Sequence, residues 1–366
     1  MGESFLRVDS FAGFHPFLLV LAAAALDRLV GDPRWCPHPV VAMGWWISRL
    51  RRLTEDWAGD RPWALRLGGG LITSALVGSS GLAGWGLEQL ALAGLEAGSV
   101  WGTAGLSLLT IALASALAGR SLEQAVLAVL AQLPATPTEP LTPARQQLAW
   151  IVGRDTAQLD RGGILRALAE TASENAVDGL FAPLFWMLLG AWLWQVGGGT
   201  GPGPLALAWS FKAASTLDSM LGYRQGRLQW LGTAGARLDD LLVWLPCRLV
   251  SLSLPLVASW PLPGPRRWWT QVQQSWRDGR PDPSPNAGLS QASYAHATGV
   301  QLGGVNHYGG IVRSKPLLAP GRPVPDQAAV LRMLALSQRL ELLWLLAAAG
   351  GVSISLPVRI ITKTLS

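Results

Sequence analysis

Charged side chains are scarce in this chain, since Asp, Glu, Lys and Arg make up 14% of 366 residues, against 50% hydrophobic residues. A soluble domain usually has about 25% charged residues. The low charge therefore excludes an ordinary soluble globular domain. The 19 Trp residues point the same way, because Trp rings gather at lipid headgroup level as well as in protein cores.

Cysteine and lysine are also rare. The two cysteines, Cys36 and Cys247, are too few for a disulfide framework or a structural zinc site. No Gly-Lys pair occurs, so the chain lacks the phosphate-binding P-loop motif. The net charge of +6 comes from arginines that stand between apolar runs. This pattern is typical of the flanks of membrane helices, and we expect no binding of nucleic acid.

Long uncharged runs dominate what is present. Residues 67–87 and 97–119 each meet the need for about 20 apolar residues to cross a bilayer. Further runs lie at 11–26, 180–196, from about 205, and 342–358. The Gly- and Pro-rich stretch 197–204 predicts a turn between the run at 180–196 and the run from about 205. Residues 88–96 contain no Lys or Arg, so we expect this connector to face outward. We predict an all-α, polytopic integral membrane protein of one domain, 1–366, with roughly five to seven membrane segments.

The apolar run 241–263 has two interpretations, because Pro246, Arg248 and Pro255 interrupt it. Such residues are tolerated at membrane depth mainly where protein or water surrounds them. If the run is re-entrant or interfacial, all charge-rich segments share the cytoplasmic side. If it crosses the membrane, residues 264–332 lie on the opposite side.

Most of the basic residues lie in four charge-rich segments. These segments are 27–66, 120–178, 212–240 and 264–332. We predict that they converge on one site, which requires that 241–263 does not cross fully.

An acidic stripe is predicted in the second segment. Glu170, Glu174 and Asp178 recur at i, i+4 and i+8, which places three carboxylates along one helical face. Like charges so spaced repel each other unless a positive group lies among them. A divalent metal, a phosphate-bound metal, or Arg154 and Arg166 would supply that positive group. The alternative is an acidic face exposed to solvent.

The segment 212–240 offers two further candidates. Lys212 lies in an apolar run with hydroxyl residues at i+4 and i+7, and a lysine at membrane depth indicates function. Asp239 and Asp240 suit metal ligation. Arg237 and Asp240 are equally consistent with a simple i, i+3 ion pair.

The fourth segment contains turn chemistry at 282–288 and a glycine-rich loop at 302–310. Glycine-rich loops let backbone N–H groups approach an anion closely. Without a P-loop, the phosphates of a nucleotide would be held by metal, arginine and loop amides.

Ordered blocks of the sequence resemble the adenosylcobinamide-phosphate synthases of cobalamin biosynthesis, the CobD/CbiB family. The resemblance runs from Asp27 to about Lys315, and several blocks in the right order are more specific than any one of them. The blocks are 27–33, 37–40, 154–156, 170–175 with 178–179, 212–213, 216–223, 236–240, 283–288 and 302–310. Asp282 and His307 depart from the residues that the family usually has there.

The resemblance implies an ATP-dependent amide ligase in the inner (plasma) membrane, multi-pass, with a cytoplasmic active site. It would join adenosylcobyric acid to (R)-1-aminopropan-2-ol or its O-phosphate, with Mg²⁺ as cofactor and ATP as co-substrate. A carboxylate is a poor acyl donor, and its phosphorylation, which depends on positioning and charge neutralisation, supplies a leaving group. Expected partners are these small molecules, membrane lipid, and either a second copy or other corrinoid-pathway membrane enzymes.

The resemblance also assigns roles to the candidate residues. The expected catalytic residues are Glu174, Asn175, Asp178 and Lys212. The expected metal ligands are Glu170, Glu174, Asp178, Asp239 and Asp240. The expected nucleotide-binding residues are Arg154, Asp155, Arg237, Asn286, Gly303, Gly304 and Asn306.

Two other classes of protein fit parts of the pattern. A transporter of a corrinoid or metal would also have intramembrane polar residues and spans broken by Gly and Pro, but no internal repeat is visible. A membrane transferase acting on a diphosphate substrate would use paired aspartates. A measurement of corrinoid-dependent ATP hydrolysis distinguishes the ligase, the transporter and the transferase. Only the ligase requires both a carboxylate and an amine for this hydrolysis.

Overall fold

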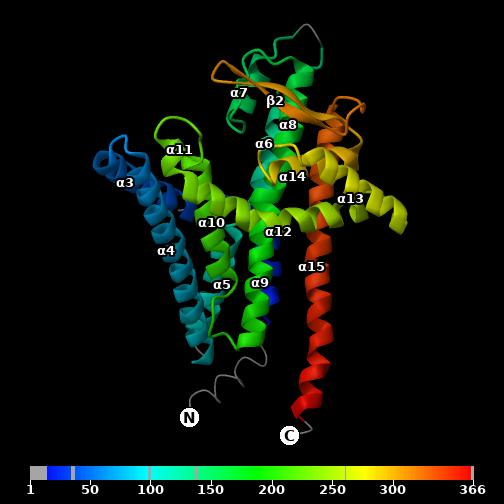
Figure 1. Ribbon diagram of the computed structural model, residues 1–366. Helices are drawn as coiled ribbons and strands as arrows, with labels where there is room; N and C mark the ends of the chain where they lie inside the picture. Colours follow the sequence, from blue (N-terminus) through cyan, green and yellow to red (C-terminus); the bar gives the residue numbers. More distant parts are fainter. Residues whose placement is uncertain (1–14, 34–37, 98–99, 137–138, 260, 364–366) are drawn as a thin grey trace. The chain divides into compact units, whose positions relative to one another are not determined.

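The computed structural model of the chain is helical apart from one β-hairpin (Figure 1). It describes residues 15–33, 38–97, 100–136, 139–259 and 261–363. The all-α prediction is confirmed, whereas Cys36 lies outside the described residues. The chain divides into two compact units, and the boundaries fall inside helices. Unit 1 is 1–120, 182–242 and 347–366, and unit 2 is 121–181 and 243–346. The expectation of a single membrane domain stays a prediction.

Unit 1 is built from helices. They are α2 (Pro16–Val30), α3 (Pro39–Ala58), α4 (Pro62–Glu96), α5 (Val100–Ala114), α9 (Ala182–Gly197), α10 (Pro204–Leu221), α11 (Leu228–Leu231) and the start of α12 (Thr233–Ala258). Proline occupies the first position of α2, α3, α4 and α10. Proline suits this position because its missing N–H would have no partner in the first turn.

Unit 2 contains the remaining elements. They are α6 (Gly119–Ala131), α7 (Thr142–Ala149), α8 (Arg161–Ala176), the π-helical turn η2 (Val177–Phe181), the rest of α12, α13 (Pro265–Gly279), α14 (Ala287–Thr298), β1 (Leu302–Tyr308), β2 (Ile311–Leu318) and α15 (Gln327–Lys363). Helix α6 begins at the boundary, and the last part of α15 belongs to unit 1.

Helices α4 and α10 lie side by side in unit 1 (Figure 1). The buried face of α4 carries small residues, among them Gly69, Ser80 and Gly84. A Cβ atom on Gly84 would lie 2.8 Å from the Cα atom of Ala206 on α10. Small residues of this kind let the backbones of membrane helices approach closely.

Gly84→Leu is expected to lower the free energy of unfolding of unit 1 by about 1–3 kcal/mol or more, because the larger side chain meets the backbone of α10. Thermal unfolding of the purified protein in detergent measures the effect. Gly78→Leu is the matched control, since nothing lies within 4 Å of a Cβ atom on Gly78 of the same helix. Equal melting temperatures of the two variants would contradict the close packing of α4 on α10.

The glycine-rich turn predicted between 197 and 204 is confirmed, since α9 ends and α10 begins there. Residues 88–96 are not a connector, because they form the end of α4. The buried carboxylate of Glu88 accepts hydrogen bonds from the backbone N–H groups of Gly203, Leu205 and Ala206 at 2.9, 2.6 and 3.2 Å. A side chain of α4 therefore caps the N-terminus of α10, where four N–H groups lack helical partners.

Fewer helices qualify as membrane spans than the predicted five to seven. In the described part of the chain three are long and apolar enough, 62–96, the continuous helix 161–197 and 233–258. A fourth results if the pair 102–114 and 119–131, bent by 41°, is one span. Of the other expected runs, α2 has only 15 residues, and α10, which includes Lys212 and Asp218, is not among the helices that are apolar enough. The apolar run at 342–358 extends into residues whose side chains are not described.

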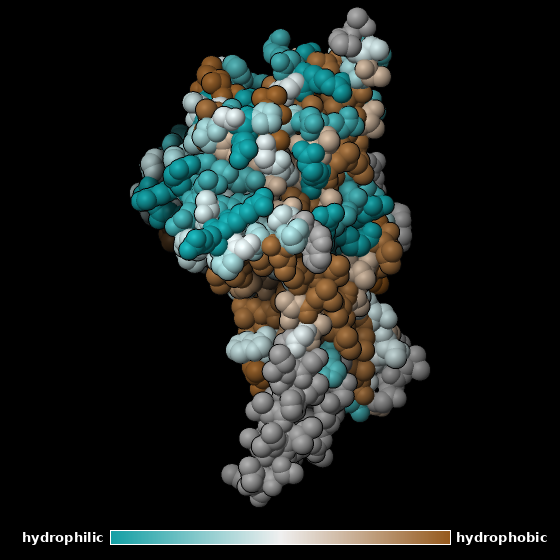
Figure 2. Space-filling view, turned by 90° about the vertical axis from the view of Figure 1, so that its right-hand side faces the viewer, coloured by the Kyte–Doolittle hydropathy of each residue, from teal (hydrophilic) through white to brown (hydrophobic). Residues whose placement is uncertain are grey.

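Apolar side chains also cover part of the surface. On α4 the exposed side chains of Leu67, Leu71, Leu82 and Leu90 alternate with the buried small residues. Figure 2 shows one face of the molecule, on which hydrophobic side chains form a broad area and hydrophilic side chains gather elsewhere. An apolar outer surface of this extent fits lipid as the surrounding medium.

The stretch 302–310 is not a loop, because residues 302–308 form β1, which pairs antiparallel with β2. Gly309 and Gly310 form the two-residue turn with φ values of 56° and 78°. Such a tight hairpin turn requires positive φ at both positions, which glycine adopts without strain. At Gly303, where φ is 82°, an added Cβ atom would lie 1.9 Å from the Pro316 carbonyl oxygen. The glycines thus serve the hairpin itself.

The acidic stripe is interrupted by a change of helix type. Helix α8 ends at Ala176, and Asp178 lies in the π-helical turn that follows. Single π-turns are rare and often occur at functional sites. The α-helical spacing that placed Asp178 with Glu170 and Glu174 therefore does not continue to that residue.

Candidate functional site

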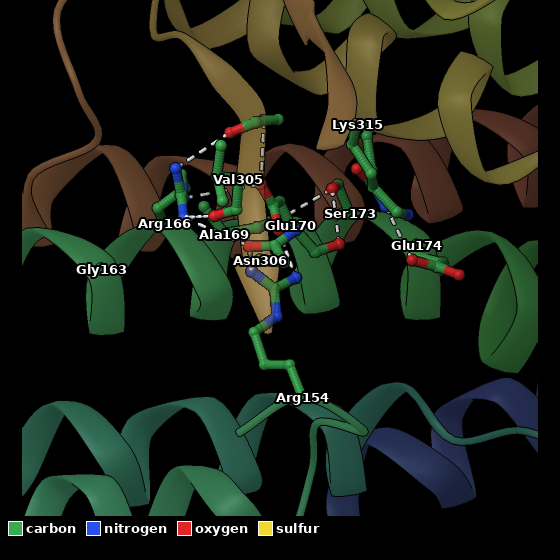
Figure 3. A network of polar contacts seen from close by, with 12 residues as sticks. Arg154, Gly163, Arg166, Ala169, Glu170, Ser173, Glu174, Val305, Asn306 and Lys315 are labelled. Atoms are coloured by element: carbon green, nitrogen blue, oxygen red, sulfur yellow. Dashed lines mark hydrogen bonds and ion pairs between the residues drawn. The ribbon is translucent and has the colours of Figure 1, made fainter. Parts of the chain in front are cut away.

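A buried network of polar side chains lies in unit 2, between α8, β1 and the loop before α8 (Figure 3). At its centre Arg154 forms an ion pair with Glu170 of α8 and donates a hydrogen bond to Asn306 Oδ1 of β1 at 2.9 Å. The other carboxylate oxygen of Glu170 accepts the backbone N–H of Gly303 at 2.8 Å. The exposed fraction is 7% for the Arg154 side chain and 1% for that of Glu170.

The second arginine of the network is Arg166, one helical turn before Glu170. Its guanidinium donates to the carbonyl oxygens of Gly303 and Val305 at 3.1 and 2.8 Å, and to Asn306 Oδ1 at 3.2 Å. Arg166 therefore joins α8 to β1, as the hydrogen bond between Glu170 and Gly303 also does. Arg154 and Arg166, one of the alternatives for the acidic stripe, both pair with its first carboxylate, Glu170.

Two buried donors of this network have no hydrogen-bond partner in the described part of the chain. They are Asn306 Nδ2 and Arg166 Nε. Because Asn306 Oδ1 accepts from both arginines, the orientation of its amide is fixed and Nδ2 is the atom left over. Buried donors normally find an acceptor. The site therefore offers hydrogen-bond donors to an anionic or carbonyl oxygen.

A second polar group surrounds Glu174, one turn after Glu170. Gln291 Nε2 of α14 donates to the Glu174 carboxylate at 2.7 Å. Lys315 Nζ of β2 lies 3.6 Å from the carboxylate of Asp282. Burial by itself lowers the pKa of Lys315, but the charges of Glu174 and Asp282 outweigh it and raise the pKa above the ordinary value. Lys315 is thus a protonated ammonium between two carboxylates.

Asp155 closes the turn of the hairpin. Its carboxylate accepts the backbone N–H groups of Gly309 and Gly310 at 3.1 and 2.9 Å, and its own N–H donates to the His307 carbonyl oxygen. The amides of Gly310 and Gly309 hold the pKa of Asp155 below its usual range. The structure therefore gives Asp155 a role in shaping the hairpin, and nucleotide binding by Asp155 stays a prediction.

Asn286 lies before α14 and contacts the middle of α12. Its side-chain oxygen accepts a hydrogen bond from Arg248 at 2.5 Å, and its backbone oxygen accepts one from Cys247 Sγ at 3.4 Å. Arg248 also donates to the Pro285 carbonyl oxygen at 2.8 Å. The turn chemistry predicted at 282–288 is confirmed, since Ser284 N–H bonds to the Asp282 carboxylate.

Lys212, in unit 1, is half-buried on α10. The hydroxyls expected on its face bond to the backbone of α10, Thr216 to the Lys212 carbonyl oxygen at 2.7 Å and Ser219 to that of Ser215 at 2.9 Å. Both hydroxyls thus donate to backbone oxygens of α10, and the functional role of Lys212 stays a prediction.

The paired aspartates also lie in unit 1. Asp239 and Asp240 are half-buried on α12, and Arg237 of the same helix is exposed. Asp239 lies close enough to Asp218 and Asp240 for their charges to interact, and its Oδ1 is buried without a hydrogen-bond partner in the described part of the chain. Adjacent like charges with an unpaired oxygen fit a cation.

The candidate residues are thus divided between the units. Unit 2 holds Arg154, Asp155, Glu170, Glu174, Asn175, Asp178, Asn286, Gly303, Gly304 and Asn306, and unit 1 holds Lys212, Arg237, Asp239 and Asp240. Among the described residues no group of three His, Cys, Asp or Glu side chains is close enough together to hold a metal ion. The metal and catalytic roles stay predictions.

Sequence reasoning missed two residues of the site. Gln291 lies in a run of small and apolar residues, and nothing in the pattern distinguishes it. Lys315 had a signal, because it is one of three lysines and lies at the end of the family resemblance. Its position opposite Gly304 follows from the hairpin register, which only the pairing of β1 with β2 provides.

Comparison with known proteins places the chain in a family. The family model described as CobD/Cbib protein matches residues 20–337. The chain is 41% identical over 304 residues to cobalamin biosynthesis protein CobD of Synechocystis sp., covering 83% of this chain and 82% of the relative. It is 38% identical to cobalamin biosynthesis protein CbiB of Salmonella typhimurium, with 90% and 97% covered.

A third relative, cobalamin biosynthesis protein CobD of Pelobacter propionicus, is 38% identical over 86% of this chain and 88% of its own length. No solved structure matches the chain. The family model extends over far more than half of the chain and includes every candidate site residue. The chain therefore belongs to the CobD/CbiB family.

Proposed function

We propose that this protein acts in cobalamin biosynthesis as an ATP-dependent amide ligase. It joins adenosylcobyric acid to (R)-1-aminopropan-2-ol or its O-phosphate and forms adenosylcobinamide or its phosphate. Family membership carries this proposal, since the relatives are named cobalamin biosynthesis proteins and two cover 83% and 90% of the chain. The apolar helices support a membrane protein, and we propose the inner membrane with the active site on the cytoplasmic face.

The proposed reaction has two steps. A carboxylate oxygen of the corrinoid attacks the γ-phosphorus of ATP, which gives an acyl phosphate and releases ADP. The amine then attacks the acyl carbon, the C–N bond forms, phosphate leaves and the amine loses a proton. Both steps concentrate negative charge, so the protein must position and neutralise anionic oxygens.

The unit 2 network has the groups for this task. Asn306 Nδ2 and Arg166 Nε are buried donors that make no hydrogen bond in the described part of the chain. Arg166 Nε lies 4.0 Å from the Glu170 carboxylate, and both donors suit an anionic oxygen of substrate. Glu170 holds Arg154 and the Gly303 amide, so it positions these groups and is a poor metal ligand. In this proposal Lys315 and Lys212 neutralise charge on the phosphates and the acyl group.

Mg²⁺ fits one set of carboxylates better than the other. Both oxygens of Glu170 are already engaged by Arg154 and Gly303. In unit 1, by contrast, Asp239 has an unpaired buried oxygen beside Asp240. Mg²⁺ is usually held by one or two carboxylates together with substrate phosphates, so this pair would hold it. When bound, the ion would neutralise charge on the nucleotide phosphates.

The ligase proposal predicts that ATP hydrolysis requires both substrates. Purified full-length protein, in detergent with Mg²⁺, is supplied with adenosylcobyric acid, each amine, both or neither, and ADP and corrinoid products are measured. We expect one ADP per amide bond and little ADP without the amine. ATP hydrolysis that ignores the amine would contradict the proposal. Corrinoid uptake into proteoliposomes without amide formation would favour a transporter.

A further inference from the structure

Helix α13 of unit 2 combines basic and aromatic side chains in an arrangement that the proposed function does not use. It carries Arg266, Arg267 and Arg277, and Trp269 and Trp276 are 47% and 45% exposed. Its buried face is narrow and centres on Val272, Ser275 and Asp278. Helices that are polar overall, with arginine on one face and tryptophan on another, are typical of the membrane interface.

The second half of α12 runs alongside α13. Trp268 Nε1 donates to the Leu252 carbonyl oxygen at 2.8 Å, and Trp276 Nε1 donates to Ser251 Oγ at 3.0 Å. With its arginines and glutamines, α13 cannot lie in hydrocarbon. The stretch of α12 beside it must therefore lie at the same depth, although its composition alone would permit a span.

The two helices enclose one side of a cavity of about 560 Å³. Its lining includes Trp244 and Arg248 of α12, and Trp276, Arg277 and Arg280 at the end of α13. The lining has three guanidinium groups and no carboxylate. A volume of this size suits a small ligand group, and the charge selects an anion.

The arginines of the cavity differ in what they already bind. Arg248 lies over the Trp244 ring, 4.6 Å from its centroid, and is engaged by Asn286. Arg277 Nε is 3.0 Å from the Asp278 carboxylate. Arg280 has no side-chain hydrogen bond or ion pair within the described ranges. Guanidinium donors remain available in the cavity, and these suit phosphate geometry.

We propose that the α12–α13 pair, residues 243–258 and 265–279, lies in the plane of the membrane interface and that the cavity binds the phosphate of an anionic phospholipid headgroup. The tryptophans lie at headgroup level, the arginines contact the phosphate, and the acyl chains extend along apolar protein surface. A lipid is favoured over a soluble anion because the cavity is lined by the very helices that carry the interfacial tryptophans. Residues 241–263 then do not cross the membrane.

The lipid part is tested with the full-length protein, delipidated in detergent and titrated with dioctanoyl phosphatidylglycerol by native mass spectrometry. We expect the double variant Arg277→Gln/Arg280→Gln to bind about thirtyfold more weakly, since each basic residue near anionic lipid contributes about a fivefold effect on affinity. Arg322→Gln/Arg332→Gln is the matched control, because both arginines are exposed elsewhere in unit 2. It should stay within twofold of the unchanged protein.

Two further probes separate the sources of the phosphate. Dioctanoyl phosphatidylcholine should bind more weakly than phosphatidylglycerol, and glycerol 3-phosphate should not displace the lipid at equal concentration. Equal binding of the two lipids, displacement by glycerol 3-phosphate, or unchanged affinity in the Arg277/Arg280 variant would overturn the lipid site.

The interfacial placement is tested by cysteine labelling from one side of the membrane. Gln225→Cys precedes α12 and Gln273→Cys lies on α13, and both glutamines are exposed. In a background without Cys36 and Cys247, an impermeant maleimide should label both positions from the same side. Labelling from opposite sides would show that α12 crosses the membrane and would overturn the proposal.

Discussion

Glu170→Ala is expected to lower the free energy of unfolding by about 3–5 kcal/mol, because it leaves the buried Arg154 guanidinium without its counter-ion. The Gly303 N–H loses its acceptor in the same variant. The loss should appear as a lower melting temperature of the purified protein in detergent. Hydrogen exchange should speed up most in β1, since that strand depends on this carboxylate.

The double variant Arg154→Met/Glu170→Met is the control for this prediction. Replacing both members of a buried ion pair by apolar residues of similar volume is often nearly neutral, so the double variant should recover most of the stability. If the double variant recovers the melting temperature but not the ligase activity, the ion pair serves substrate binding in addition to folding. If Glu170→Ala melts normally and instead needs more Mg²⁺, Glu170 is a metal ligand and the positioning role is wrong.

Lys212→Met is expected to abolish ligase activity almost entirely while the protein still folds. The ammonium is half-buried on a largely apolar helix, a position that is costly unless an anion compensates it. A substrate phosphate or a nearby carboxylate is the expected anion. Initial rates at varied ATP concentration, with melting temperature as the folding readout, measure this effect.

Lys212→Arg is the matched variant, because it keeps the charge but not the compact geometry of the ammonium. It should fold and should show a raised KM for ATP with residual turnover. Near-normal turnover and ATP affinity in Lys212→Met would show that the lysine only extends its charged end to the interface. The phosphate role would then pass to Arg154 or Arg237.

The helical part of the fold was predictable because uncharged runs, proline starts and a glycine-rich turn are local signals. The turn between α9 and α10 and the proline at the start of α4 are examples. The hairpin at 302–318 was not predicted, because its glycines suggested an anion-binding loop. The signal for a hairpin was present in Gly309-Gly310 between two runs that contain β-branched residues.

The residues of the site were predictable from the sequence, but the contacts between them were not. Helical spacing correctly placed Glu170 and Glu174 on one helix, and the need for a positive group pointed to Arg154 and Arg166. Which group each carboxylate meets depends on contacts over more than 100 residues of sequence, such as Glu174 with Gln291. The π-turn at Val177–Phe181 has no simple sequence rule, so the position of Asp178 could not be deduced.

The cap that Glu88 provides to α10 has a consequence for how the protein is made. The carboxylate and the Gly203 amide are 115 residues apart in the sequence, so α4 leaves the ribosome well before its partner exists. Until then Glu88 is a carboxylate without these N–H partners near the end of a largely apolar helix, where a charged group is costly in hydrocarbon. We therefore expect α4 to be held most stably in the bilayer once α10 has formed and paired with it.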